Sequence, residues 1–195
     1  MSNKIVDSHC HLNFPQFKDN LKEVVQRALD NGVSKMLTIS TKLNEINELE
    51  KISNMYSEVY NSIGVHPHEC KKYKNLSLED LLKYTKNPKC IGIGETGLDF
   101  YYENSPKELQ TKLFKIHIEA ARKSSLPLIV HTRNADIETI QILKSEMKKE
   151  KFSGLIHCFS TSQELAESAI DLGLYISLSG MVTFDKSHEL RNIIK

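Results

Sequence analysis

Apolar and polar residues follow two alternating spacings along the whole chain. Short aliphatic runs are followed by segments in which apolar residues recur three or four positions apart. The first spacing is typical of buried strands, and the second of amphipathic helices. The chain therefore predicts strands at residues 5–9, 35–40, 58–65, 90–94, 128–131, 154–157 and 175–178. Helices are predicted between them at residues 19–30, 43–55, 78–85, 105–123, 137–147 and 163–172, and a last helix starts at residue 187.

The helix at residues 105–123 carries the clearest terminal signals. Ser105 is predicted to cap it, Pro106 fits its first position, and Glu108 completes a capping box. The apolar stripe that follows predicts burial of one helix face, through Leu109, Leu113, Ile116 and Ala120.

Strands that alternate with helices predict a parallel sheet covered by helices. The 195 residues suit one domain over residues 1–195. Seven strands fit an open doubly wound sheet, and they also fit a TIM-type (β/α) barrel that lacks one of its usual eight strands. The count alone does not separate these two α/β folds.

Composition narrows the class of protein without naming a substrate. A net charge of +1 gives no electrostatic reason to expect nucleic acid as a partner. The first residues lack the apolar stretch of a signal peptide, and no apolar run is long enough to cross a bilayer, so we expect a cytoplasmic protein without membrane contact. The four scattered cysteines are expected to be free thiols.

Polar residues with metal-binding side chains end several of the predicted strands. Parallel strands bring these ends to one edge of a sheet, so residues far apart in sequence converge there. Neutral imidazoles and a carboxylate are the ligands that a borderline divalent ion takes. The residues predicted to form this metal site are His9, His11, Glu95, His131 and His157.

Other residues near the strand ends receive different interpretations. His66 is predicted to contact the substrate, and the forked donors of Arg133 could bind an anionic oxygen. His68 lies past a proline and is a weaker candidate. His117 and His188 are interpreted as structural or solvent-facing.

Five motifs in this order resemble the TatD family of metal-dependent deoxyribonucleases, within the amidohydrolase-like barrels. They lie at residues 7–12, 64–68, 92–99, 128–133 and 157–160. The resemblance implies a TIM-type barrel and one or two divalent ions, Mg²⁺, Mn²⁺ or Zn²⁺. It also implies that Glu95 bridges the two ions and acts in catalysis. His9 and His11 would hold one ion, His131 and His157 the other. DNA or another phosphodiester is the implied substrate.

The sequence departs from the family pattern in its last residues. The family carries an acidic ligand after an eighth strand, and no matching motif occurs before Lys195. We therefore expect an incomplete domain, unpaired edges on the first and last strands, and low activity. The alternatives are an amidohydrolase-type hydrolase of C–N, ester or lactone bonds, or a catalytically impaired remnant. The sequence leaves the oligomeric state open.

Overall fold

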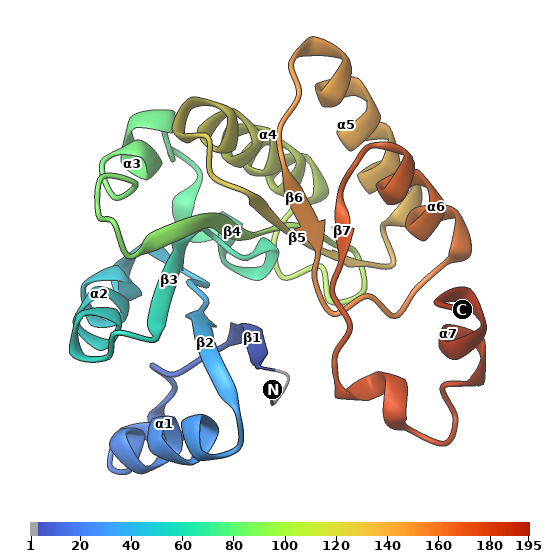
Figure 1. Ribbon diagram of the computed structural model, residues 1–195. Helices are drawn as coiled ribbons and strands as arrows, with labels where there is room; N and C mark the ends of the chain where they lie inside the picture. Colours follow the sequence, from blue (N-terminus) through green and yellow to red (C-terminus); the bar gives the residue numbers. More distant parts are fainter. Residues whose placement is uncertain (1–3) are drawn as a thin grey trace.

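The computed structural model describes residues 4–195 as one curled parallel sheet with helices on its outer side (Figure 1). The strands pair in sequence order from β1 to β7, and every pairing is parallel. Their bounds are β1 (Ile5–Cys10), β2 (Val33–Thr38), β3 (Val59–Ile63), β4 (Cys90–Asp99), β5 (Leu128–Arg133), β6 (Gly154–Ile156) and β7 (Tyr175–Ile176). This architecture confirms the TIM-type prediction with seven strands and excludes the doubly wound sheet.

The helices connect successive strands and form an arc around the sheet (Figure 1). Their bounds are α1 (Leu21–Asp30), α2 (Ile46–Met55), α3 (Leu78–Leu82), α4 (Lys107–Ser124), α5 (Asp136–Lys149), α6 (Gln163–Asp171) and α7 (His188–Ile193). Short 3-10 helices are η1 (Pro15–Phe17), η2 (Leu43–Glu45), η3 (Pro67–Tyr73) and η4 (Gly180–Thr183). None of these helices is both long and apolar enough to cross a lipid bilayer.

Helix α4 packs against the central strand β4 and buries Leu113 and Ala120 from its predicted stripe. The predicted cap of this helix is wrong. Pro106 is the N-cap residue, while the Ser105 hydroxyl donates to the carbonyl of His68 and accepts from the N–H of Lys71. A capping box occurs instead at α3, between Ser77 and Asp80.

Strand β4 is longer than predicted and runs five residues past Gly94, to Asp99. All residues from Gly92 to Asp99 are buried, because β3 and β5 flank the strand and α4 covers its outer side. Gly97 has a positive φ of 137°, and a β-carbon there would collide with the carbonyl oxygen of His131. The glycine thus permits a close approach of β4 and β5.

The two outermost strands, β1 and β7, each pair with one neighbour only within residues 4–195. Exposed apolar side chains occur along both, including Val6 at 60% and Tyr175 at 76%. The hydroxyls of Ser8 and Ser177 nevertheless lie only 3.4 Å apart, so the two edges face each other across the mouth of the curl. The unpaired edges agree with the prediction for these strands.

Candidate metal centre

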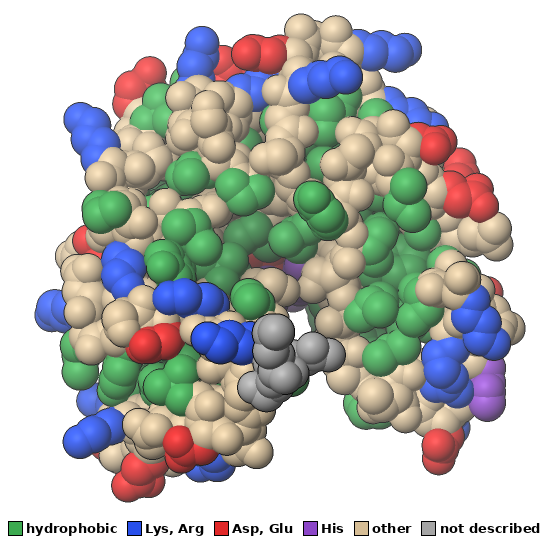
Figure 2. Space-filling model, in the orientation of Figure 1, with side chains coloured by type: hydrophobic (Ala, Val, Ile, Leu, Met, Phe, Trp, Pro, Cys, Tyr) green, Lys and Arg blue, Asp and Glu red, His purple; other side chains and the backbone are tan. Residues whose placement is uncertain are grey.

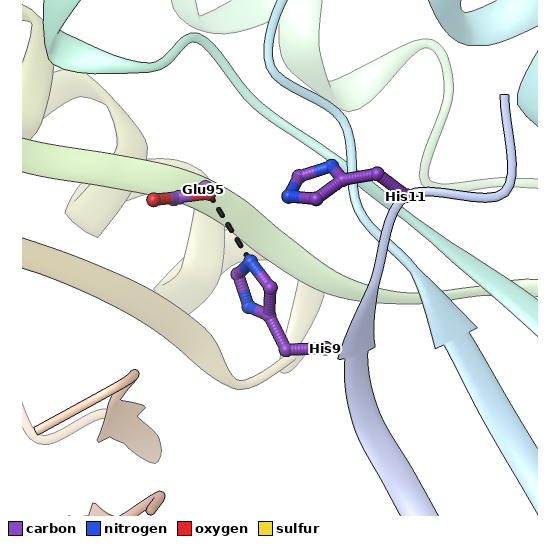
Figure 3. Close-up of side chains that lie close together, drawn as sticks. All are labelled: His9, His11 and Glu95. Carbon is purple, nitrogen blue, oxygen red and sulfur yellow. Dashed lines mark ion pairs between the residues drawn. The ribbon is translucent and has the colours of Figure 1, made fainter. Parts of the chain in front are cut away.

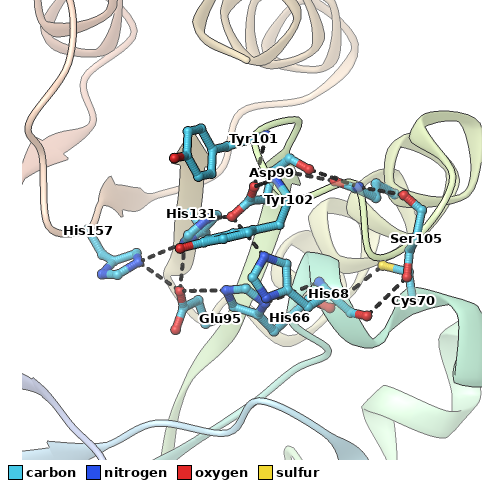
Figure 4. A network of polar contacts seen from close by, with 11 residues as sticks. His66, His68, Cys70, Glu95, Asp99, Tyr101, Tyr102, Ser105, His131 and His157 are labelled. Carbon is cyan, nitrogen blue, oxygen red and sulfur yellow. Dashed lines mark hydrogen bonds and ion pairs between the residues drawn. The ribbon is translucent and has the colours of Figure 1, made fainter. Parts of the chain in front are cut away.

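Glu95 lies at the centre of the polar cluster that the strand ends form. It comes from the buried strand β4, and its side chain is 5% exposed. Its Oε2 lies 3.3 Å from His9 Nε2, at the end of β1. Its Oε1 lies 2.9 Å from His131 Nδ1 of β5 and 2.7 Å from His157 Nε2, directly after β6. The predicted convergence of strand ends therefore occurs in the structure (Figure 4).

The two histidines of β1 lie on the same side of the cluster as predicted. The ring centroids of His9 and His11 are 5.2 Å apart, and both face Glu95 (Figure 3). Cys10 between them points elsewhere and donates its thiol to the carbonyl of Leu37. The imidazole of His9 also stacks on that of His157, with centroids 4.1 Å apart, so residues from opposite ends of the sheet are in contact.

Two groups of donor atoms in this cluster are close enough to bind one ion each. In the first, donor atoms of His9, His11 and Glu95 lie within 4.8 Å of one another. The second consists of His66, Glu95 and His131. His157 also belongs beside this second group, because its Nε2 lies 3.3 Å from His131 Nδ1. Glu95 is common to both groups, which suits a bridging carboxylate.

The charge states of these groups suit a cation. Burial acts to raise the pKa of Glu95, but four surrounding imidazoles outweigh it and hold that pKa well below its usual range. Burial lowers the pKa of His11, His66 and His157, so these rings are neutral near pH 7. The buried Nδ1 atoms of His9, His11 and His157 have no hydrogen-bond partner in the described structure. The neutral imidazoles of His11 and His157, each with an unsatisfied nitrogen, lie beside an ionised carboxylate, and this arrangement fits a divalent metal.

Asp99 is a site residue that the sequence analysis missed. Its Oδ2 accepts hydrogen bonds from His131 Nε2, at 3.1 Å, and from His68 Nε2, at 2.9 Å. Burial tends to lower the pKa of His131, but its bonds to Asp99 and Glu95 outweigh this and raise the pKa to about 9. A carboxylate behind a histidine fixes the orientation of the ring and is a common support for a metal ligand.

His66 lies almost as close to Glu95 as His9 does, with its Nε2 3.4 Å from Oε1. Its Nδ1 accepts a hydrogen bond from the backbone N–H of His68, so a neutral ring carries its proton on Nε2. Arg133 lies outside the cluster, where its guanidinium stacks on Tyr101 and Tyr102.

The other two histidines lie outside the cluster. The ring of His117 is fully buried in α4 and accepts a hydrogen bond from Val65 N–H, so its structural interpretation agrees with the structure. His188 is exposed at the start of α7.

The cluster forms the floor of an open cavity of about 920 Å³. Its walls include β1 through Ile5 and Val6, and the segment after β7 through Leu178 and Gly180. A hollow is visible between these two sides of the molecule, with histidine atoms at its depth (Figure 2). A substrate can therefore reach the cluster from solvent.

Known proteins share this arrangement of sequence and fold. The model of the family described as TatD-related DNase matches residues 6–195. The chain belongs to this TatD-related DNase family. An uncharacterized metal-dependent hydrolase of Buchnera aphidicola is 40% identical over 200 residues, covering 98% of this chain and 75% of that protein. The Escherichia coli protein YcfH, another uncharacterized metal-dependent hydrolase, is 35% identical over 191 residues, covering 96% and 71%.

A solved TatD-family structure supports the same assignment. The crystal structure of YJJV, a TatD homologue from Escherichia coli, superposes with a TM-score of 0.89 at 28% identity, covering 97% of this chain and 73% of that one. The chain is therefore a metal-dependent hydrolase of the TatD family.

Proposed function

We propose that this chain is a divalent-metal-dependent deoxyribonuclease that hydrolyses phosphodiester bonds in DNA. The observation that carries the proposal is the ionised, buried carboxylate of Glu95, which imidazoles from four strand ends surround on the floor of an open cavity. Membership of a family described as DNases supports the choice of bond.

The two oxygens of Glu95 divide the ligands into two sets. His9 and His11 would hold one cation together with Glu95, and His131 and His157 would hold a second with the same carboxylate. Mg²⁺, Mn²⁺ and Zn²⁺ are the candidates, and the imidazole-rich donor set favours Mn²⁺ or Zn²⁺. A divalent cation in such a site supplies an acidified water and positive charge for the phosphoryl oxygens.

Glu95 acts by charge and orientation. Because its pKa is well below the usual range, it stays ionised throughout the working pH range and is a weak proton acceptor. It would orient the attacking water by accepting one of its hydrogens. The proton that this water loses would pass to solvent, the new P–O bond would form as the bond to the leaving oxygen breaks, and that oxygen would take a proton from solvent. Asp99 keeps the His131 ring in place through its bond to Nε2.

His66 and Arg133 are the donors for the substrate. His66 lines the cavity, and its Nε2 proton, which faces Glu95 Oε1 at 3.4 Å, could instead be donated to a non-bridging phosphoryl oxygen of a bound substrate. The forked guanidinium of Arg133 can bind a phosphate with two parallel hydrogen bonds. Both contacts stabilise negative charge that grows during in-line attack.

The test is cleavage of end-labelled oligonucleotides by the purified chain with Mg²⁺, Mn²⁺ or Zn²⁺. Glu95→Gln keeps the shape of the side chain and removes the charge between the two ligand sets. We expect it to lower both metal content and cleavage by more than about 100-fold, beyond the range for loss of a supporting carboxylate. Glu138→Gln is the matched control, because Glu138 is an exposed residue of α5.

The same purified chain is also tested for hydrolysis of lactones, carboxylic esters and cyclic amides. Turnover of one of these without oligonucleotide cleavage would reject the nuclease and keep a metal-dependent hydrolase. Stoichiometric metal without any turnover would identify a catalytically impaired chain.

A further inference from the structure

Two exposed tyrosines stand beside the metal centre. Tyr101 and Tyr102 lie in the turn after β4, separated from its last residue by Phe100, and are 55% and 53% exposed. Their backbone N–H groups both donate to Asp99 Oδ1 at 3.1 Å, and the N–H of Phe100 donates to the carbonyl of Arg133. Because Asp99 also holds His131, the tyrosine backbone is fixed to the same strand ends as the site.

Arg133 packs against both tyrosine rings. Its guanidinium carbon lies 4.1 Å from the ring centroid of Tyr101 and 4.7 Å from that of Tyr102. These ring contacts are the ones that its guanidinium makes. Within residues 4–195 it forms no ion pair and no hydrogen bond. The two rings lie at 88° to each other, so the planar guanidinium can lie flat on only one of them, and N–H groups remain for a ligand. The group is therefore a positively charged donor held in place without an acidic partner.

The tyrosines are close enough to the centre to contact the same substrate. The ring of Tyr102 packs edge-on against His68, with centroids 5.3 Å apart, and His68 lines the cavity. Figure 4 shows Tyr101 and Tyr102 beside His131, above Glu95 in this view. Large exposed aromatic rings here have no function in the core.

We propose that Tyr101, Tyr102 and Arg133 form a binding site for the nucleotide next to the scissile bond in a single strand. Because the two tyrosine rings lie at 88° to each other, the base stacks on the exposed face of one of them, and the adjoining phosphate binds the free N–H groups of Arg133. Every base has a π-face, so such stacking tolerates any sequence. In a duplex the base faces are covered by their neighbours, so this site selects frayed ends and single strands. The inference rests on the proposed phosphodiester substrate.

The experiment compares two fluorescently labelled strands of equal length, oligothymidylate and the same backbone with abasic positions. Binding is measured by fluorescence anisotropy in EDTA, so that no cleavage occurs, and cleavage is measured separately with Mn²⁺. The chain should bind the thymidine strand more tightly by about 10- to 100-fold, the range expected from stacking of one base. The double substitution Tyr101→Leu and Tyr102→Leu should remove this preference and raise KM more than it lowers kcat.

Arg133→Met provides a second, independent change. It should weaken both strands by a similar factor, because both carry phosphates, and should reduce the dependence of binding on salt. Tyr175→Leu is the control, since Tyr175 is 76% exposed on β7. Thermal melting of each variant checks the fold, and the exposed positions predict little change.

The outcomes separate this inference from the proposed function. Equal binding of thymidine and abasic strands by the unchanged chain would overturn the nucleotide site, even if both strands are cut. A base preference that the tyrosine substitutions leave intact would overturn it as well. Base-dependent binding without any cleavage would support the site and reject the nuclease.

Discussion

The two sides of the cavity differ in how firmly they hold their residues. On the side of β4 and β5, every residue from Gly92 to Asp99 is buried, and Glu95 and Asp99 both bond to His131. On the side of β1 and β7, edge strands carry exposed apolar residues, and the imidazoles of His9 and His11 keep an unpartnered Nδ1. The site therefore combines two carboxylates on the buried strand β4, called here the rigid wall, with a histidine pair at the end of the edge strand β1, whose position can change more easily.

This difference has a thermodynamic meaning. Regions with many buried apolar contacts open only with the whole domain, whereas edges with few contacts open locally. We expect substitutions in the rigid wall to affect stability and site together. Substitutions on the edge strands should affect association with other chains more than the fold.

The largest expected effect on unfolding free energy comes from replacing a glycine by alanine, which is compared at one position on the side of β4 and at one position on the side of β7. Gly97→Ala adds a β-carbon against the carbonyl of His131 at a φ of 137°. Overpacking and backbone strain together should cost about 4 kcal/mol of unfolding free energy. At Gly180, beyond β7, a β-carbon meets no atom within 4 Å, so Gly180→Ala should change stability by less than about 0.5 kcal/mol. Urea unfolding of both variants measures the contrast, and equal losses would contradict it.

The second prediction concerns acid stability of the rigid side. Burial lowers the pKa of His117 to about 4, although its bond to the carbonyl of Leu113 acts in the opposite direction. Its Nε2 accepts a hydrogen bond from Val65 N–H. Protonation would put a hydrogen on Nε2, so that two N–H groups would face each other and this bond would be lost. Between pH 6.5 and 4 the unfolded chain binds the proton and the folded chain does not. Stability is therefore complete above pH 6.5 and falls by about 3 kcal/mol toward pH 4.

The variant for this test is His117→Gln, whose amide can accept from Val65 and donate to Leu113 without titrating. The difference in unfolding free energy between the two chains should shrink steadily as pH falls below 6.5. A difference that stays constant from pH 7.5 to 4.5 would show that His117 does not titrate with folding.

The third prediction separates the supporting carboxylates of the two walls. Asp99→Asn keeps a side chain beside His131 but removes the charge that fixes its ring, so Mn²⁺ affinity should fall by about 10- to 100-fold. Asp7→Asn on β1 should have a smaller effect, because Asp7 Oδ1 accepts only from the backbone N–H of His9. Isothermal titration with Mn²⁺ measures the affinity of both variants. Similar losses of affinity would contradict the prediction that the carboxylate on β4 supports the site more than the one on β1.

The pattern of strands and helices was sufficient for a parallel α/β sheet and for the convergence of the histidines, whereas the choice of a barrel came from the resemblance to the TatD family. The convergence has a general reason. Strand ends in a parallel sheet meet at one edge, so His9, His131 and His157 could be placed together from the pattern alone. The pattern was not sufficient for Asp99. Glycines at positions 94 and 97 are typical of strand ends, and the predicted strand stopped there. Alternation continued through Asp99 would have put it on the same face as Glu95.

Contacts between distant segments explain the remaining differences. Ser105 has the local signals of a helix cap, but a turn of η3 competes for its hydroxyl, and no short-range rule contains that turn. The stacking of Arg133 on Tyr101 and Tyr102 likewise joins β5 to the loop after β4. Side-chain choices of this kind follow from the packed fold and not from periodicity.

The last prediction concerns charged substitutions on the edge strands, which should change the free energy of unfolding little but reduce association between copies of the chain. Val6→Lys with Tyr175→Lys places charges on both exposed edge strands, and unfolding free energy should stay within about 0.5 kcal/mol per site. Charged edges oppose pairing with other strands, so light scattering should show less growth of apparent mass with concentration. Ile137→Lys is the control, because Ile137 is 62% exposed, close to the 60% of Val6, but lies on α5. If that helix variant suppresses association as strongly as the edge variant, general surface charge and not the open edge is the cause.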